Sequence, residues 1–271
     1  MKVAALQMVS GTVLDANLAE ARRLLEQAAA AGAELAVLPE YFCLLGARDT
    51  DKLAIAEPFG AGPIQDFLAR SARELGLWIA GGTLPLAGRG ADRARNSCLV
   101  FDPRGRCVAR YDKIHLFRFD DGAQHFDEAR VLERGDAPAL FTLAARDGRT
   151  WRVGLSVCYD LRFPELYRGY AAQGADLLLV PSAFTHTTGQ AHWEMLLRAR
   201  AIENLAYVLA PAQGGLHENG RRTWGHSMLV DPWGEVLAQQ AEGAGCVAGA
   251  LDAQRLARLR AQLPALEHRR L

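Results

Sequence analysis

Several features that mark particular classes of protein are scarce or missing in this sequence of 271 residues. Basic and acidic side chains number 31 each, so the formal net charge is zero. A balanced charge lacks the basic footprint that proteins use to bind nucleic acid or an anionic membrane surface. No apolar run approaches the roughly 20 residues that a helix needs to span a bilayer. We therefore expect a small-molecule ligand, and neither nucleic acid nor a membrane as a partner.

Cysteine and histidine also lack the spacings that metal sites use. The five cysteines are odd in number and contain no CxxC pair, which argues against a disulfide framework or a zinc knuckle. The seven histidines form neither HxxxH nor HxH, so we expect no metal site. The start, MKVAALQMV, is more typical of a first strand than of a signal peptide. These features favour a reduced, cytoplasmic protein.

Hydrophobic residues make up 50% of the chain, and their pattern occurs twice. The first half predicts strands at 2–8, 35–38 and 77–83, helices at 18–31 and 62–75, and a hairpin at 96–111. The second half predicts strands at 151–157, 174–182 and 206–212, helices at 164–172 and 192–204, and a hairpin at 227–239. GADLLLVPS echoes GAELAVLPE, and both hairpins turn at Asp-Pro-x-Gly. The chain is therefore a doubled supersecondary unit.

Each predicted half is β-α-β-α-β followed by a hairpin, which is typical of an α/β fold with a largely parallel sheet. Two such halves can bury their free sheet faces against each other. The sequence thus predicts one domain over 1–271, a four-layer α-β-β-α sandwich of two pseudo-symmetric halves. The tail, about 251–271, is expected to pack on this core or on a partner subunit. The matched strand ends at Glu40 and Ser182 should lie close together, where ligands bind in such sheets.

Cys158 has a position that suits a nucleophile. It follows the apolar strand in WRVGLSVCYDLRFPE and precedes a helical pattern, with Asp160 as a potential N-cap. Backbone N–H groups at such a junction favour a thiolate and can receive an oxyanion. The alternative interpretation is an inert buried thiol.

Two further polar residues follow predicted strands. Glu40 ends the strand of GAELAVLPE, and Lys113 follows the first hairpin; taken singly, either is a surface charge or a cap. Together with a thiol they suit acyl transfer, because the carboxylate accepts the thiol proton and the lysine stabilises the oxyanion. A Cys-His hydrolase that uses His115, His125 or His192 is the alternative that these residues leave open.

Three segments carry a resemblance to a known family. LAVLPEYF, YDKIHLF and VGLSVCYDLRFPELYR resemble, in order, the motifs of the nitrilase superfamily of carbon–nitrogen hydrolases, and the similarity runs to about residue 240. The family fold is the four-layer sandwich. The resemblance implies Glu40 as general base, Lys113 with the N–H of Tyr159 as oxyanion stabilisers, and Cys158 as nucleophile. It also implies a second glutamate that orients the lysine; Glu128 is the candidate, ahead of Glu133.

A narrower resemblance follows Cys158. SAFTHTTGQAHWEMLLRARAIENLAYVLAPAQGG is similar to the branch that contains deaminated-glutathione amidases, whose relatives are the omega-amidases. It implies a cytoplasmic, self-associating amidase, a homodimer or higher homo-oligomer, that cleaves a small acidic amide through a Cys thioester without cofactor or metal. Deaminated glutathione is the expected substrate. The alternatives are an omega-amidase acting on 2-oxoglutaramate or 2-oxosuccinamate, a nitrilase, and a catalytically silent binding protein.

The same resemblance suggests where substrate binds. The segment 182–188 should line the pocket, which makes Phe184 and Thr185 candidate substrate contacts. Arg162 is a further candidate, although an ion pair with Glu165 that braces the turn is the alternative. Glu194 and Arg198 should pair across one helical turn, and Arg200 is expected to be a surface or interface charge.

Overall fold

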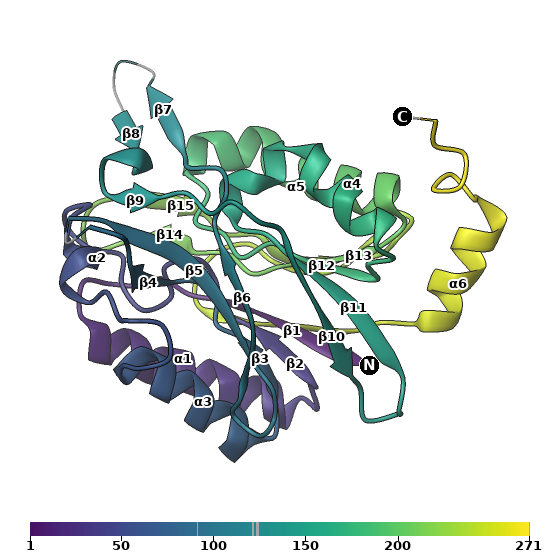
Figure 1. Ribbon diagram of the computed structural model, residues 1–271, viewed down its shortest axis with the longest axis horizontal. Helices are drawn as coiled ribbons and strands as arrows, with labels where there is room; N and C mark the ends of the chain where they lie inside the picture. Colours follow the sequence, from purple (N-terminus) through teal and green to yellow (C-terminus); the bar gives the residue numbers. More distant parts are fainter. Residues whose placement is uncertain (91, 121, 123–124, 271) are drawn as a thin grey trace.

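The computed structural model describes residues 1–90, 92–120, 122 and 125–270 (Figure 1). Two sheets and the helices outside them form its body. The strands of the first sheet are β1 (Lys2–Gln7), β2 (Leu35–Val37), β3 (Trp78–Ala80), β4 (Leu84–Ala87), β5 (Ala94–Phe101), β6 (Cys107–Asp112), β9 (Leu132–Glu133) and β18 (Gly245–Ala250). Those of the second sheet are β10 (Ala139–Ala144), β11 (Thr150–Leu155), β12 (Leu177–Leu179), β13 (Tyr207–Ala210), β16 (Ser227–Val230) and β17 (Val236–Gln240).

The remaining elements cover the sheets or rim one end of them. The helices are α1 (Leu14–Ala30), α2 (Asp51–Ala54), α3 (Pro63–Leu75), α4 (Pro164–Ala172), α5 (His186–Asn204) and α6 (Ala253–Gln262), with 3-10 turns η1 (Glu128–Arg130) and η2 (Cys158–Arg162). Two small hairpins are formed by β7 (Arg118–Asp120) with β8 (His125–Asp127), and by β14 (Gly214–Leu216) with β15 (Arg222–Trp224).

The elements stack in four layers. Strands β1, β2 and β3 are parallel, and α1 and α3 cover their outer face. Strands β11, β12 and β13 repeat that arrangement beneath α4 and α5 (Figure 1). The inner faces of both sheets bury their apolar side chains in one shared core that contains Val3, Val37, Val153 and Leu177. This confirms the predicted α/β sandwich, whose apolar strand runs are buried on both faces.

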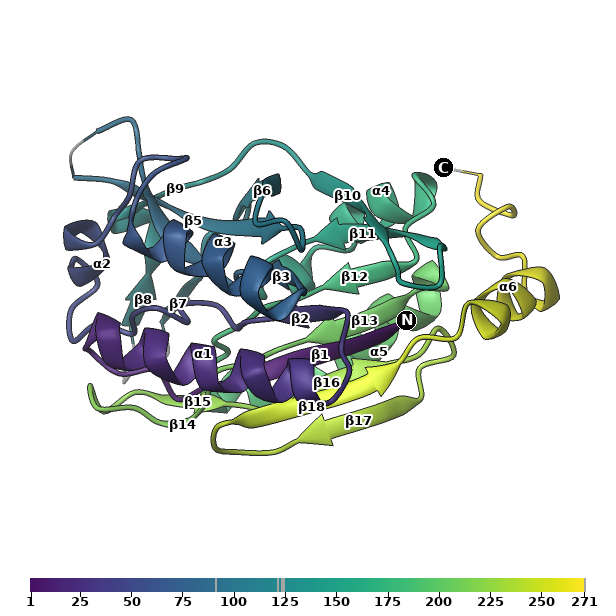
Figure 2. The same cartoon turned by 90° about the horizontal axis from the view of Figure 1, so that it is seen from below.

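The strand β18 was not predicted from the sequence. It pairs antiparallel with β1, from Lys2 opposite Ala250 to Gln7 opposite Gly245 (Figure 2). The C-terminal half thus contributes an edge strand to the sheet of the N-terminal half. Its sequence, GCVAGA, contains two glycines and gives little local strand signal. Only pairing with a segment more than 200 residues away makes it a strand.

Two predicted helix starts are wrong, and so is the predicted cap Asp160. Helix α1 begins at Leu14, one turn earlier than the predicted start at residue 18, and Asp15 lies in its first turn. Helix α5 begins at His186, because the Thr185 hydroxyl accepts the N–H of Thr188 at 3.4 Å. Asp160 does not cap α4, whose N-cap is Phe163. Polar residues in the first turn of α5 hid its helical periodicity from the sequence analysis.

The C-terminal helix α6 contacts the second half of the chain. Leu256 and Leu259 are buried, and Arg260 forms an ion pair with Asp176 at 2.9 Å. The organisation of 1–271 as a single domain stays a prediction. In the part of the chain that the structure describes, no helix combines the length and the apolar character needed to cross a membrane.

Candidate active site

Cys158 lies on a tight turn between β11 and α4. Its backbone has φ +48°, a left-handed conformation that costs a non-glycine residue of order 1–2 kcal/mol. The turn is held in this shape from two sides. The N–H of Cys158 donates to the carbonyl of Pro181 at 3.0 Å, and the N–H of Val157 donates to Asp160 Oδ2 at 2.8 Å. The fold therefore fixes the thiol at the carboxyl end of the second sheet.

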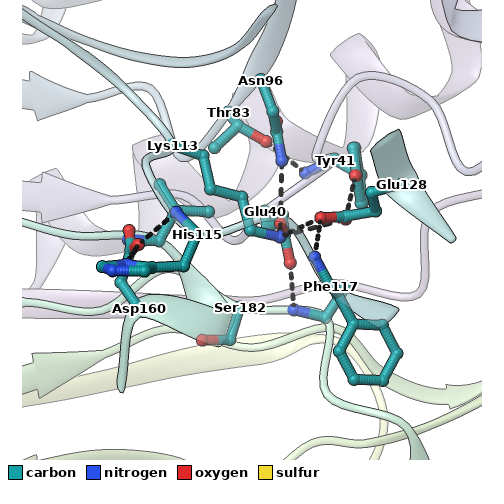
Figure 3. A network of polar contacts seen from close by, with 12 residues as sticks. Glu40, Tyr41, Thr83, Asn96, Lys113, His115, Phe117, Glu128, Asp160 and Ser182 are labelled. Carbon is teal, nitrogen blue, oxygen red and sulfur yellow. Dashed lines mark hydrogen bonds and ion pairs between the residues drawn. The ribbon is translucent and has the colours of Figure 1, made fainter. Parts of the chain in front are cut away.

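Asp160 connects this turn to the first sheet. Tyr111 donates its hydroxyl to Oδ2 at 2.7 Å, and the N–H of His115 donates to Oδ1 at 3.0 Å. His115 Nδ1 also lies 2.7 Å from Oδ1 (Figure 3). Tyr111 and His115 flank Lys113, so one buried carboxylate positions both the cysteine turn and the lysine. The predicted role of Asp160 as a helix cap is wrong, because its partners lie 45 and 49 residues away along the chain.

Lys113 links two carboxylates. Its Nζ lies 2.9 Å from Glu40 Oε1, 2.8 Å from Glu128 Oε2 and 3.0 Å from Glu128 Oε1 (Figure 3). The Lys113 side chain is fully buried, and 1% of the Glu40 side chain is exposed. Two acids around one buried ammonium form a hydrogen-bonded ion network in which each partner offsets the desolvation of the others.

Two donors hold the Glu40 carboxylate from opposite sides. Asn96 donates its amide to Oε1 at 2.8 Å, and the backbone N–H of Ala183 donates to Oε2 at 2.9 Å. Glu40 follows β2 of the first sheet, and Ala183 follows Ser182 of the second. The expected proximity of Glu40 and Ser182 is thereby confirmed. Asn96, on β5, was missed because an asparagine within a hairpin strand gives no sign of its partner.

Glu128 is held as firmly as Glu40. Tyr41 donates its hydroxyl to Oε1 and Phe117 its N–H to Oε2, both at 2.7 Å. Glu133, the alternative to Glu128, instead lies 3.4 Å from Arg95 and does not contact Lys113. The structure thus brings together Glu40, Lys113 and Glu128, as the resemblance implies.

Burial and this network set the pKa values of the site. Burial raises the pKa of Glu40, against the opposing charge of Lys113. Burial also raises the pKa of the Cys158 thiol well above its usual range, and the negative charge of Glu40 adds to the effect. Burial disfavours the Lys113 cation, but Glu128 and Glu40 outweigh it and raise the pKa of that lysine.

The pKa of Glu128 shifts in the opposite direction to that of Glu40. Burial disfavours its ionised form, but the charge and hydrogen bonds of Lys113 prevail and lower the pKa of Glu128. At neutral pH the site therefore contains a lysine cation, a Glu128 anion and a neutral thiol. Glu40, with its raised pKa, is the group suited to accept and return a proton.

A cavity of about 400 Å³ opens over these groups. Both halves line it, with Glu40, Glu128, Cys158 and Tyr159 at the reactive end and Phe184, Thr185 and Arg162 along the wall. The Arg162 guanidinium lies 5.8 Å from the ring centroid of Tyr159 and 5.5 Å from that of Phe184. Its Nη1 lies 3.2 Å from His192 Nδ1, and no pair with Glu165 occurs among the described residues. Arg162 therefore faces the cavity instead of bracing the turn.

The backbone N–H of Tyr159 donates to no carbonyl in the described part of the chain. Tyr159 is the second residue of η2, and the first N–H bonded within this turn is that of Asp160, which donates to Val157. The leading N–H groups of such a turn have no carbonyl within it to accept them. The N–H of Tyr159 is thus available next to the thiol.

Other residues are not brought to the thiol. His115 contacts Asp160, His125 contacts Asp120 and His192 contacts Arg162, and no bond from these histidines to Cys158 occurs within the described ranges. The Cys-His alternative lacks its central contact. Arg200, expected at the surface, is buried and donates to the carbonyl of Leu161, whereas the predicted pair of Glu194 with Arg198 is present at 3.2 Å.

Comparison with known proteins agrees with this site. A family model described as carbon–nitrogen hydrolase matches residues 2–261. A deaminated glutathione amidase from Synechocystis sp. is 43% identical over 269 residues, which cover 98% of this chain and 97% of the relative. Human omega-amidase is 36% identical over 271 residues, covering 99% and 95% of the two chains.

Solved structures show the same fold. The NitFhit protein of C. elegans superposes with a TM-score of 0.90 at 37% identity, covering 99% of this chain and 65% of the other, less than two thirds of its length. A mutant amidase from Nesterenkonia sp. AN1, with acrylamide added at its active site cysteine, has a TM-score of 0.80 at 26% identity. The two chains are covered to 97% and 98%.

This chain belongs to the carbon–nitrogen hydrolase family. It is accordingly a hydrolase that acts on carbon–nitrogen bonds, and the resemblance to the nitrilase superfamily is confirmed. The roles of individual side chains stay predictions.

Proposed function

We propose that this protein is a thiol amidase that hydrolyses deaminated glutathione at the amide of its 2-oxoglutaramate part. The observation that carries the proposal is the Glu40–Lys113–Glu128 cluster beside Cys158, buried at the meeting point of the two sheets. The names of the Synechocystis and human relatives support amide hydrolysis. The acrylamide adduct on the Nesterenkonia amidase supports a cysteine nucleophile.

The first half-reaction forms a thioester. Cys158 Sγ attacks the amide carbon, and Glu40 accepts the thiol proton as the S–C bond forms. The tetrahedral intermediate collapses, the C–N bond breaks, and Glu40 returns its proton to the leaving nitrogen. The raised pKa values of both groups suit this exchange, because a neutral thiol needs a base and a carboxyl that holds a proton can act as an acid.

The negative charge on the carbonyl oxygen needs donors that are already in place. Lys113 Nζ and the N–H of Tyr159 supply them in a buried site, where such interactions are strong. Glu128 acts as a positioning residue, because its two bonds to Lys113 keep the ammonium charged and hold it next to Glu40.

The second half-reaction releases the acid. Glu40, ionised again after the amine departs, takes a proton from water, and the hydroxide equivalent attacks the thioester carbon. The C–S bond breaks, and the proton on Glu40 returns the Cys158 thiolate to a thiol. The products are 2-oxoglutarate and cysteinylglycine.

Substrate orientation follows from the cation that faces the cavity. Arg162 lies four residues after the nucleophile on the same turn, so it can bind the carboxylate of the 2-oxo acid part. Phe184 and Thr185 line the adjacent wall and flank the acyl chain. This places the acyl part of the substrate over η2.

An omega-amidase acting on 2-oxoglutaramate or 2-oxosuccinamate is the second candidate. The identity to human omega-amidase favours it, and the same residues would perform the reaction with ammonia as the leaving group. Mass spectrometry with both substrates side by side separates the two. Faster release of cysteinylglycine supports our proposal, whereas faster turnover of 2-oxoglutaramate contradicts it.

We also propose a cytoplasmic homodimer or higher homo-oligomer. Large apolar side chains are exposed on α5 and the adjoining β16–β17 turn, where Met195 is 72% and Trp233 56% exposed. Arg198 joins these elements by donating to the carbonyl of Gly234. Light scattering of the wild type and of Trp233→Asp tests this surface; a monomeric wild type contradicts it.

A further inference from the structure

The cavity has a second cationic region, away from Arg162. Helix α2 and the hairpins β7–β8 and β14–β15 gather at the end of the molecule opposite α6 (Figure 1, Figure 2). Lys52 of α2 and Arg221 of the β14–β15 turn both line the cavity there. Neither residue was singled out by the sequence, and neither has a part in the chemistry proposed above.

The Lys52 ammonium lies over an aromatic ring and pairs with no acid in the described part of the chain. It lies 4.8 Å above the ring centroid of Tyr41, and none of the hydrogen bonds or salt bridges between described residues involves its Nζ. Burial lowers the pKa of Lys52, against the more distant charges of Glu128 and Asp49. A desolvated ammonium that lines a cavity and has no carboxylate within ion-pair distance among the described residues is a site suited to an anion.

Arg221 adds a second positive charge at the same place. Its guanidinium lies 4.9 Å from the ring centroid of Phe126 and 4.0 Å from Asp49 Oδ1. The turn that carries it is fixed, because Asn219 donates its amide to the carbonyl of Gly46 at 2.6 Å. In this region Arg221 has Asp49 at the limit of ion-pair distance, and Lys52 adds a cation that pairs with no described acid.

We propose that Lys52, assisted by Arg221, binds the carboxylate at the amine end of the substrate, the glycyl carboxylate of deaminated glutathione. This rests on the proposed function and deepens it. 2-Oxoglutaramate lacks that carboxylate, so the Lys52 site is what selects the longer substrate.

The direction of the substrate follows from the proton transfer. The leaving nitrogen must face Glu40, which protonates it, while the acyl carbon stays on Cys158. Tyr41 follows Glu40 in the chain, and the Lys52 ammonium lies over the Tyr41 ring. The amine part thus extends toward Lys52, and the acyl part toward Arg162 on the turn of the nucleophile.

The two cationic regions belong to one cavity. Three aromatic rings, Tyr159, Phe117 and Phe126, form a wall between Arg162 and Arg221, with centroid separations of 5.2 and 5.8 Å. Extended deaminated glutathione separates its two carboxylates by roughly 12 Å, a little more than three residues of chain. Each of its two carboxylates thus has a cationic region in the same cavity.

A binding cycle tests the pairing of Lys52 with the carboxylate. Calorimetry on the Cys158→Ala protein compares deaminated glutathione with its C-terminal amide, with and without Lys52→Met. With Lys52 present, the acid should bind about 10- to 100-fold more tightly than the amide, the range of a charge-assisted hydrogen bond. With Lys52→Met the preference should fall below about 3-fold, and Lys52→Arg should restore most of it.

The matched control is Arg222→Met. Arg222 lines the same cavity but already pairs with Glu242 at 3.0 Å, so its loss should change the acid preference less than about 2-fold. An acid preference that is absent from the start, or that persists in Lys52→Met, overturns the inference. A different result contradicts the proposed function: faster turnover of 2-oxoglutaramate than of deaminated glutathione by the wild type. In that case the binding cycle still decides the role of Lys52.

Discussion

The two halves of the molecule share one architecture but contribute different chemistry. At the end of β2, Glu40 enters a network with Lys113 and Asn96. At the matching end of β12, Ser182 donates its hydroxyl to the nearby carbonyl of Val180 at 3.0 Å, its one side-chain hydrogen bond among the described residues. The first half thus supplies the acid and the lysine, and the second supplies the thiol. The repeated architecture provides two similar strand ends, and the few side chains that differ between them give each end a different role.

Removing the thiol should have the largest effect on this division of roles. Cys158→Ala is expected to lower kcat by at least about 10⁴-fold, because no other group can form the thioester. The fold should persist, since the turn is held by backbone bonds and Asp160. Turnover and a thermal melt of the same sample check this. Substantial activity in a folded variant would show that the nucleophile lies elsewhere.

Substituting each of the two matched strand-end residues in turn compares the halves directly. Glu40→Gln should lower kcat about 10²- to 10⁴-fold through loss of the base. Ser182→Ala should change kcat less than about 3-fold. It should lower the free energy of unfolding by about 1 kcal/mol through its one lost hydrogen bond. Steady-state kinetics on both variants test the contrast. Equal losses of kcat would mean that the two strand ends are not specialised.

The same Glu40→Gln variant should be more stable than the wild type at neutral pH. The pKa of Glu40 is raised in the folded state, so its stabilising contribution is present at low pH and is lost as pH rises through that pKa. Glutamine mimics the neutral carboxyl. The gain in Tm should therefore be larger at pH 8 than at pH 5, and a gain confined to pH 5 would contradict the sign of the shift.

A second buried acid, Asp160, should act through structure. Asp160→Asn turns one acceptor oxygen into a donor among groups that mostly donate, which should cost about 2–4 kcal/mol of stability. We expect a lower Tm together with a kcat loss of about 10- to 100-fold from displacement of the thiol and lysine. Unchanged stability would refute its role as the connection between the sheets.

The smallest effect concerns the pH dependence. Asn96 donates to Glu40 Oε1, and a bond to the ionised form lowers its pKa. The acid limb of kcat/KM should lie above the usual glutamate pKa of about 4.3 and should move to still higher pH in Asn96→Ala. A limb that moves downward in the variant would contradict this assignment of the base.

Local sequence predicts the repeated part of this molecule better than its connections. Strand ends, the two Asp-Pro-x-Gly hairpins and the positions of Glu40, Lys113, Glu128 and Cys158 follow from local patterns and the family motifs. Asn96, Asp160 and β18 depend on partners far along the chain, which a local pattern cannot reveal. Lys52 was missed for a further reason. A lysine on a short helix is usually solvated, and only the cavity that Lys52 lines sets it apart.

The central claim is that the acid of the first half activates the thiol of the second. It is tested most directly by the rate at which iodoacetamide alkylates Cys158 at pH 7, followed by peptide mapping. Cys107, which is exposed, serves as the internal reference. We predict that Glu40→Gln slows alkylation of Cys158 at least about 100-fold while Cys107 reacts as before. Equal rates at Cys158 in both proteins would contradict the claim.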